Sequence, residues 1–169
     1  MKSILSIIFL LSVLILGAQD KNSSLGLRGG GLSGMTYKFV DQDFKAVELI
    51  LGYQKGGMRL TGIVQKFTPV GVHRIANLFV YSGLGAHAGY VQFDERKTKT
   101  VDGIEYYSYQ KVYSPVVGAD IVIGLEYQFE SVPFNICLDY KPYMEFFGEK
   151  LFRMDFWDIG FSLRYRINN

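Results

Sequence analysis

The chain has 169 residues, a formal net charge of +2 and 49 % apolar residues. This length suits a single domain, and the 13 Phe and 12 Tyr exclude a disordered chain, which lacks the apolar surface to offset the entropy of ordering. Basic residues are scattered rather than clustered, so no nucleic-acid partner is expected. Because Cys137 is the single cysteine, no intramolecular disulfide can form.

The N-terminus has the layout of a secretory signal peptide. Lys2 provides a positive start, residues 4–16 form an apolar segment, and Ala18 is a small residue at the expected cleavage point. The apolar segment is too short for a comfortable transmembrane helix, and no later apolar run approaches the ~20 residues that such a helix needs. We therefore predict a signal peptide over residues 1–18 and one exported domain over residues 19–169.

Alternation of apolar and polar residues, the mark of a strand with two unlike faces, recurs along the exported domain. At 117–129 it continues for thirteen residues, whereas strands in globular proteins average five or six. That length is enough for the ~9–11 tilted residues with which a strand crosses a bilayer. Eight strands are expected in chain order, beginning with a hairpin over residues 25–40 and continuing at 47–54, 58–65, 78–89, 117–129, 134–140 and 157–167.

The connections between these strands alternate between short and long. The links 94–115 and 147–156 are long, whereas 131–133 is a tight turn. Outer-membrane barrels have short periplasmic turns, longer external loops and, in single chains, an even strand number. We therefore predict an all-β fold, an antiparallel up-and-down transmembrane β-barrel of about eight strands with its C-terminus in the periplasm. A soluble lipocalin-like ligand-binding barrel, or a sandwich with its apolar face inward, is the alternative, since periodicity does not show which face meets lipid.

Aromatic residues favour the membrane barrel, because they lie near the ends of the apolar faces, where such barrels place interfacial girdles. They are Tyr127, Phe129, Phe134, Tyr140, Phe146, Trp157 and Tyr165.

The chain resembles the small outer-membrane β-barrel proteins common in Bacteroidetes, of the porin or OmpA-barrel type. The last strand, Asp158–Tyr165, looks like the terminal signal by which such barrels reach their assembly machinery. The resemblance implies a bacterial outer-membrane location, with outer-membrane lipids and the barrel assembly machinery as partners, and it supplies no catalytic residues. The other segments that carry it are 25–30, 34–39, 83–87, 123–127, 133–136 and 139–142.

Charged residues fall on the predicted lumen faces, with the two signs in equal number. The interior of an eight-stranded barrel is just wide enough for its own side chains, and unpaired charges there would be costly. We therefore predict a lumen plugged by paired charges, with a narrow ion path as the alternative. The charged residues are Arg28, Lys38, Arg59, Lys141, Arg164, Arg166, Glu48, Asp120, Glu126, Asp139, Glu145 and Asp158.

Two motifs could carry chemistry. Residues 29–34 formally fit GxGxxG, but a dinucleotide site needs a helix after it, and 35–39 alternates like a strand, so a glycine-rich hairpin is expected. His87 faces the predicted lumen, which makes a lipid-modifying outer-membrane enzyme an alternative function. Its own strand offers Ser82 only on the opposite face, and His73 has no companions. We predict a non-enzymatic protein without catalytic, cofactor-binding or metal-binding residues.

The segment from Asp94 to Tyr113 is charged at first and then rich in tyrosine. Exposed tyrosines suit recognition surfaces, so this segment is the candidate site for an extracellular ligand. Its structure is open between a variable solvated loop and an ordered hairpin that rises beyond the membrane.

Overall fold

The computed structural model describes residues 22–41, 43–54, 56–70, 77–101 and 104–167. The predicted signal peptide and His73 lie outside these residues. Ten strands are present in the described chain: β1 (Asn22–Gly30), β2 (Ser33–Val40), β3 (Lys45–Gln54), β4 (Gly57–Pro69), β5 (Leu78–Val101), β6 (Ile104–Gln128), β7 (Phe134–Tyr140), β8 (Tyr143–Phe147), β9 (Phe152–Asp155) and β10 (Ile159–Arg166).

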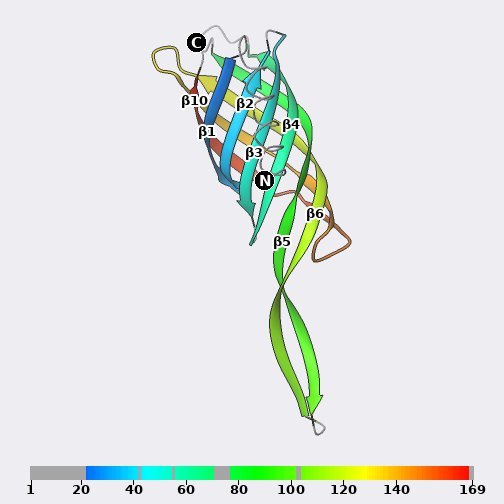
Figure 1. Cartoon of the computed structure of the whole chain (residues 1–169). Coiled ribbons are helices and arrows are strands. Elements are labelled where there is room, and N and C mark those ends of the chain that lie inside the picture. Colours follow the sequence, from blue (N-terminus) through cyan, green and yellow to red (C-terminus); the bar gives the residue numbers. More distant parts are fainter. Residues whose placement is uncertain (1–21, 42, 55, 71–76, 102–103, 168–169) are drawn as a thin grey trace, which may run out of the picture.

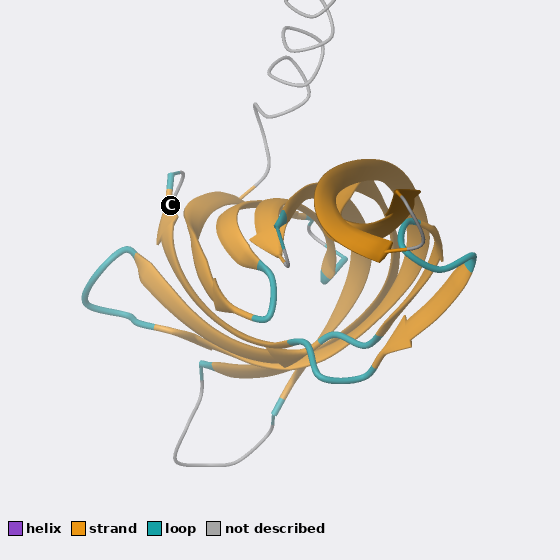
Figure 2. Ribbon diagram, turned by 90° about the horizontal axis from the view of Figure 1, so that it is seen from below, coloured by secondary structure: helices purple, strands orange, loops and turns teal. Residues whose placement is uncertain are grey.

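Eight of these strands close into a ring, seen along its axis in Figure 2. The order is β5-β4-β3-β2-β1-β10-β7-β6, and β6 pairs back onto β5. Every pairing is antiparallel. The first and last strands form the seam, where Leu27 lies opposite Leu163. The predicted all-β, up-and-down barrel of about eight strands is therefore confirmed.

The two remaining strands extend the ring instead of adding to it. Strand β8 pairs with β6 just beyond the end of β7, and only Lys141 and Pro142 separate β7 from β8. Proline has no N–H for the ladder, which explains the interruption. In the same way β9, which pairs with β8, is separated from β10 by residues 156–158. The link 147–156, expected to be a long loop, is thus largely a short hairpin.

The two ends of the barrel differ. At one end, which we call the terminal mouth, lie Asn22, Ile167 and the last residues of β2, β4 and β6. At the other lie the turns after β1, β3 and β8 and the long β5–β6 hairpin, which extends away from the barrel (Figure 1).

Beyond the barrel, strands β5 and β6 have only each other as partners. Tyr90 is the last β5 residue paired with β4, and Val116 is the last β6 residue paired with β8. We call residues 91–101 and 104–115 the arm. At ~3.3 Å per residue it extends about 35 Å. Of the two structures left open for this segment, the ordered hairpin is the one observed.

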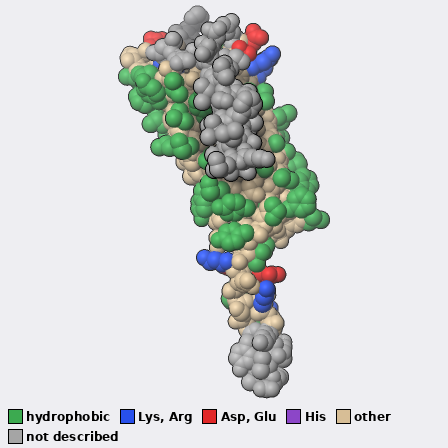
Figure 3. All heavy atoms as spheres, in the orientation of Figure 1, with side chains coloured by type: hydrophobic (Ala, Val, Ile, Leu, Met, Phe, Trp, Pro, Cys, Tyr) green, Lys and Arg blue, Asp and Glu red, His purple; other side chains and the backbone are tan. Residues whose placement is uncertain are grey.

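Polar and apolar side chains are distributed in reverse of a water-soluble protein. On the outer surface Leu84, Leu27 and Val64 are 68 %, 67 % and 61 % exposed, and hydrophobic side chains cover much of the barrel wall in Figure 3. The interior is mainly polar, with one small apolar cluster around Ile50 and Phe67. No helix among the described residues is long and apolar enough to cross a bilayer.

Candidate functional site: the polar interior

Nearest the terminal mouth, four charged side chains from β2, β3, β6 and β10 form a ring that we call the terminal cluster. Lys38 Nζ lies 3.0 Å from Glu126 Oε2 and 3.7 Å from Glu48 Oε2. Arg164 binds Glu126 through Nη1 at 3.3 Å and Glu48 through Nη2. Two cations thus face two carboxylates, and Thr36 also donates its hydroxyl to Glu48.

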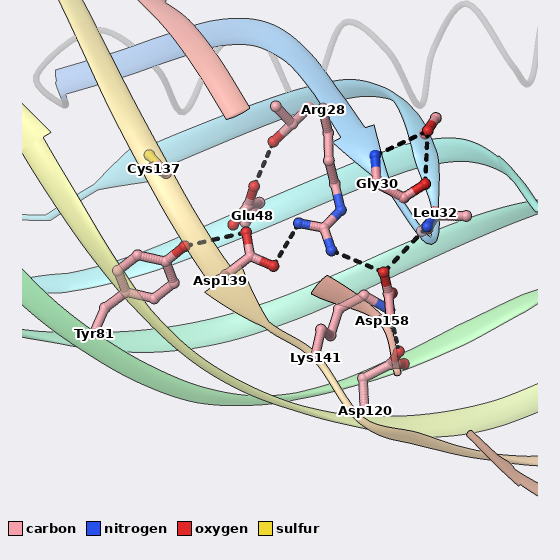
Figure 4. A network of polar contacts seen from close by, with 12 residues as sticks. Arg28, Gly30, Leu32, Glu48, Tyr81, Asp120, Cys137, Asp139, Lys141 and Asp158 are labelled. Atoms are coloured by element: carbon pink, nitrogen blue, oxygen red, sulfur yellow. Dashed lines mark hydrogen bonds and ion pairs between the residues drawn. The ribbon is translucent and has the colours of Figure 1, made fainter. Parts of the chain in front are cut away.

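Midway along the barrel lies a second group, the central cluster, shown in Figure 4. Arg28 binds Asp139 at 2.5 Å and Asp158 at 3.2 Å. Lys141 bridges Asp158 at 3.0 Å and Asp120 at 2.8 Å. Asp158 comes from the break between β9 and β10 and is fully buried. The break therefore places a buried carboxylate between two cations inside the barrel.

The β1–β2 turn is tied to the same carboxylate. The backbone N–H of Leu32 donates to Asp158 Oδ1 at 3.1 Å, and the Leu32 side chain is buried against Gly52. Gly30, the residue before this turn, has φ +142°, and an added Cβ would lie 2.1 Å from the Ile159 carbonyl. The GxGxxG segment is therefore a tight hairpin followed by strand β2, as predicted, and lacks the helix that a dinucleotide site needs.

Towards the arm lies the third group, which we call the arm-side cluster. Arg59 binds Glu145 at 2.5 Å. His87 places Nδ1 2.7 Å from Asp120 and Nε2 3.7 Å from Glu145, so it links this cluster to the central one. Its ring packs edge-on against Tyr143. The neighbours of His87 given by these contacts are therefore two carboxylates and the ring of Tyr143.

The serine considered as a nucleophile for His87 lies elsewhere. Ser82 is exposed on the outer surface, so the barrel wall separates the two side chains. Among the described residues no group of three or more metal-capable side chains is found.

Eleven of the twelve charges predicted to face the lumen are at most 5 % exposed, and in the structure each of them pairs with an opposite charge. Arg166 differs. It is half-buried at the terminal mouth, where Nη2 donates to the carbonyls of Phe129 at 2.6 Å and Val132 at 3.0 Å. Its pairing with a lumen carboxylate was therefore wrong, because its strand ends there. Cys137 is also buried in the lumen, in contact with Arg164.

Two features of the interior were not recognised from the sequence. Glycines make room for the large side chains: a Cβ at Gly160 would lie 2.0 Å from Arg28, and one at Gly118 2.4 Å from His87. Uncharged amides complete the ion pairs, since Gln65 donates to Glu48 at 2.6 Å. Along their strands, both kinds of residue occupy the same alternate positions as the charged residues. That alternation is the signal that could have identified them.

Comparison with known proteins adds one likeness. No family model matches the sequence, and no curated protein sequence matches it. A crystal structure of the N-terminal β-barrel domain of Pseudomonas aeruginosa OprF aligns with a TM-score of 0.49 and 17 % identity. The alignment covers 88 % of this chain and 98 % of that domain. Resemblance to the Bacteroidetes barrels stays a prediction from sequence.

Proposed function

We propose that the chain is an integral outer-membrane β-barrel protein with a structural or surface-interaction role. The observation that carries this proposal is the reversed distribution of side chains: charges are buried and paired inside, while leucine, valine and isoleucine cover the outside. Lipid is the solvent that such an exterior suits, and a closed ring leaves no strand edge unpaired within it. The soluble lipocalin-like alternative needs the opposite arrangement.

The terminal mouth faces the periplasm in this proposal, and the arm lies outside the cell. Short periplasmic turns and long external connections are the rule for such barrels, and the arm is the longest connection of the described chain. The arm also carries the charged run 94–97 close to the barrel, which suits water and not the bilayer core.

Selective labelling tests the membrane assignment. Ile121 is exposed on the outer surface, whereas Ser162 is buried in the lumen. In a Cys137→Ser background, Ile121→Cys in membranes should react with a lipid-phase maleimide, and Ser162→Cys should not. The reverse pattern would show that the apolar face points away from lipid. Heat-modifiable migration in gels gives a first check of barrel formation.

The second part of the proposal is that the barrel conducts poorly. Three clusters of ion pairs follow one another along the lumen, and an eight-stranded barrel has little room beyond its side chains. Planar-bilayer recordings of the purified monomer should show no large, stable openings. Such openings would refute the plugged lumen and support an ion path through the barrel.

The third part is a non-enzymatic role whose specific contacts lie on the arm. Tyr107, Tyr109 and Tyr113 are 54–71 % exposed there, and the Arg96 guanidinium lies 4.7 Å from the centre of the Tyr107 ring. Tyrosine and arginine are enriched in protein interfaces.

A deletion strain separates this role from the enzymatic alternative. Its envelope lipids, measured by mass spectrometry, should match those of the wild-type strain, and so should those of a strain carrying His87→Ala. A lipid modification restored by the natural sequence but not by His87→Ala would identify an enzyme. Deleting residues 95–109 should spare the barrel and remove ligand binding at the arm.

A further inference from the structure

The barrel wall is interrupted beside β9, at the arm end. Among the described strands β9 pairs only with β8, so its other edge has no neighbouring strand. A cavity of about 610 Å³, which we call the notch, lies between β9, the β1–β2 turn and the end of β3. Its lining residues are Gly31, Gln54, Met154, Asp155, Phe156 and Trp157.

The free edge of β9 carries backbone hydrogen-bonding groups. The N–H of Phe147 donates to the carbonyl of Leu151 at 3.1 Å, which fixes the alternation of hydrogen bonds along the antiparallel β8–β9 pair. In that alternation Phe152 and Met154 direct their N–H and C=O groups away from β8, and no described strand receives them. Two N–H donors are therefore left at the edge, roughly 7 Å apart along the strand.

The side-chain oxygens that line the notch are already bound within the protein. Gln54 Oε1 accepts from the Arg59 guanidinium and, at 3.3 Å, from the Tyr143 hydroxyl. Asp155 Oδ2 accepts from the same hydroxyl at 3.2 Å and from Arg153 at 2.9 Å. A ligand would therefore be recognised through the backbone edge of β9 rather than through these oxygens.

The surface around the notch is apolar. Met154, Phe156 and Trp157 are 49–83 % exposed, and Phe152 is exposed on the same strand as Met154. On the β3 side of the notch Tyr53 is exposed as well. The apolar exterior that we assign to lipid therefore continues up to the notch from both sides.

The notch also lies near the boundary of this apolar exterior. Exposed Glu149 and Lys150 form the tip of the β8–β9 hairpin, and Lys150 is only two residues before Phe152. Tryptophan, here Trp157, is enriched at membrane–water interfaces. In a bilayer the ester groups of the lipids occupy this boundary, between the hydrocarbon and the headgroups. An ester carbonyl accepts hydrogen bonds and donates none, which matches the N–H groups of the edge.

We propose that the notch binds a diacyl membrane lipid, whose ester carbonyls accept from the N–H groups of Phe152 and Met154. One acyl chain lies along Phe156 and Trp157. Unpaired backbone groups are costly where water is scarce, and the lipid covers two of them. The proposal rests on the membrane assignment made above.

A second copy of the chain fits the edge less well. Pairing of two identical edges needs a two-fold axis perpendicular to the sheet or along the strands. Copies in one membrane are related by an axis along the membrane normal, and barrel strands are tilted from that direction by about 35–45°. Neither kind of pairing is therefore compatible with two copies inserted in the same direction.

Native mass spectrometry of the refolded mature chain in detergent tests the site. The probe is dioleoyl phosphatidylcholine, and the control is its di-ether analogue, which has the same chains and headgroup but no ester carbonyls. The chain should retain one ester lipid, with an affinity about tenfold above that for the ether lipid, as expected for one or two hydrogen bonds. Equal affinities would overturn the proposal. A dimer that retains no lipid would identify a second copy at the edge and overturn it as well.

Variants locate the lipid at β9. Met154→Pro removes an N–H that points away from β8, so the bonds between the two strands are kept, and proline is tolerated on an edge strand. It should lower the preference for the ester lipid about threefold. Met154→Leu keeps the N–H and should leave the preference unchanged. An unchanged preference in Met154→Pro would refute the site.

Two measurements keep the outcome decisive if Met154→Pro does not fold. Phe152→Pro removes the other N–H of the edge and should have the same effect. In the natural chain, lipid brominated on its acyl chains should quench Trp157, the single tryptophan, at about tenfold lower ester than ether concentration. Quenching at equal concentrations would place the ester lipid elsewhere and refute the site.

The labelling of Ile121→Cys described above separates this proposal from the membrane assignment. If that cysteine reacts with the lipid-phase maleimide while ester and ether lipids bind alike, the notch proposal fails and the membrane assignment stands. If the cysteine does not react, the membrane assignment itself fails.

Discussion

Replacing Arg164 with methionine should destabilise the barrel strongly, although the two side chains have nearly the same volume. Arg164 is 1 % exposed and joins Glu48 to Glu126 in the terminal cluster, which Lys38 completes. In the natural chain the terminal cluster holds two cations and two carboxylates. In the variant it holds one cation and two carboxylates. Breaking a buried pair by removing one partner costs about 3–5 kcal/mol, since the other charge is left uncompensated. We expect that loss for Arg164→Met.

Urea unfolding in lipid vesicles, followed by circular dichroism and by heat-modifiable migration, measures the free energy of unfolding. Arg153→Met is the matched control, because the Arg153–Asp155 pair is partly exposed and pairs of that kind contribute about 0–1 kcal/mol. The double variant Arg164→Met with Glu48→Gln restores neutrality and should be more stable than Arg164→Met alone. A loss below about 1 kcal/mol for Arg164→Met, equal to that of the control, would refute the view that these pairs are desolvated and coupled.

Three further outcomes are expected. Gly160→Val should prevent folding in refolding assays, because its Cβ would displace Arg28 from two carboxylates. Gly29→Val, which has open space around its Cβ, should fold normally. Equal refolding yields for the two variants would contradict this reasoning. Replacing residues 95–110 with Asn-Gly, between the paired Asp94 and Lys111, should leave heat-modifiable migration unchanged, and a loss of the folded band would show that the barrel needs the arm. The single tryptophan, Trp157, is 83 % exposed, and its fluorescence should be quenched more by lipids brominated near the headgroup than near the methyl end; the opposite order would exclude a girdle position.

The fold followed from the sequence because side chains alternate with a period of two along a strand. That period separated Asp120 from Ile121 and placed one in the lumen and the other outside. It also explains the one misplaced charge. The alternation along a strand predicts which face a side chain occupies, but not how far from the end of the barrel it lies. Arg166 is the last residue of β10 and lies at the end of the barrel.

Which charge pairs with which could not be predicted from the sequence, because the paired residues come from strands far apart in the chain. Arg28 and Asp139 are 111 residues apart in the chain, and Arg164 and Glu48 are 116 apart. Nothing local marks which carboxylate meets which cation once the ring closes. A cavity at the terminal mouth, lined by Phe67, Phe129 and Asn135 among others, was missed for the same reason. These three residues come from β4, from the turn after β6 and from β7.

The seam between β1 and β10 sets an order of events during biogenesis. Its two strands come from opposite ends of the chain, so hydrogen bonding at the seam waits until the last residues are available. The same moment completes the bonds of Arg28 to Asp139 and Asp158 and of Arg164 to Glu48. A half-formed sheet within lipid would carry these ions without counterions. For a chain that inserts into lipid as proposed, we therefore expect insertion and ring closure to occur together.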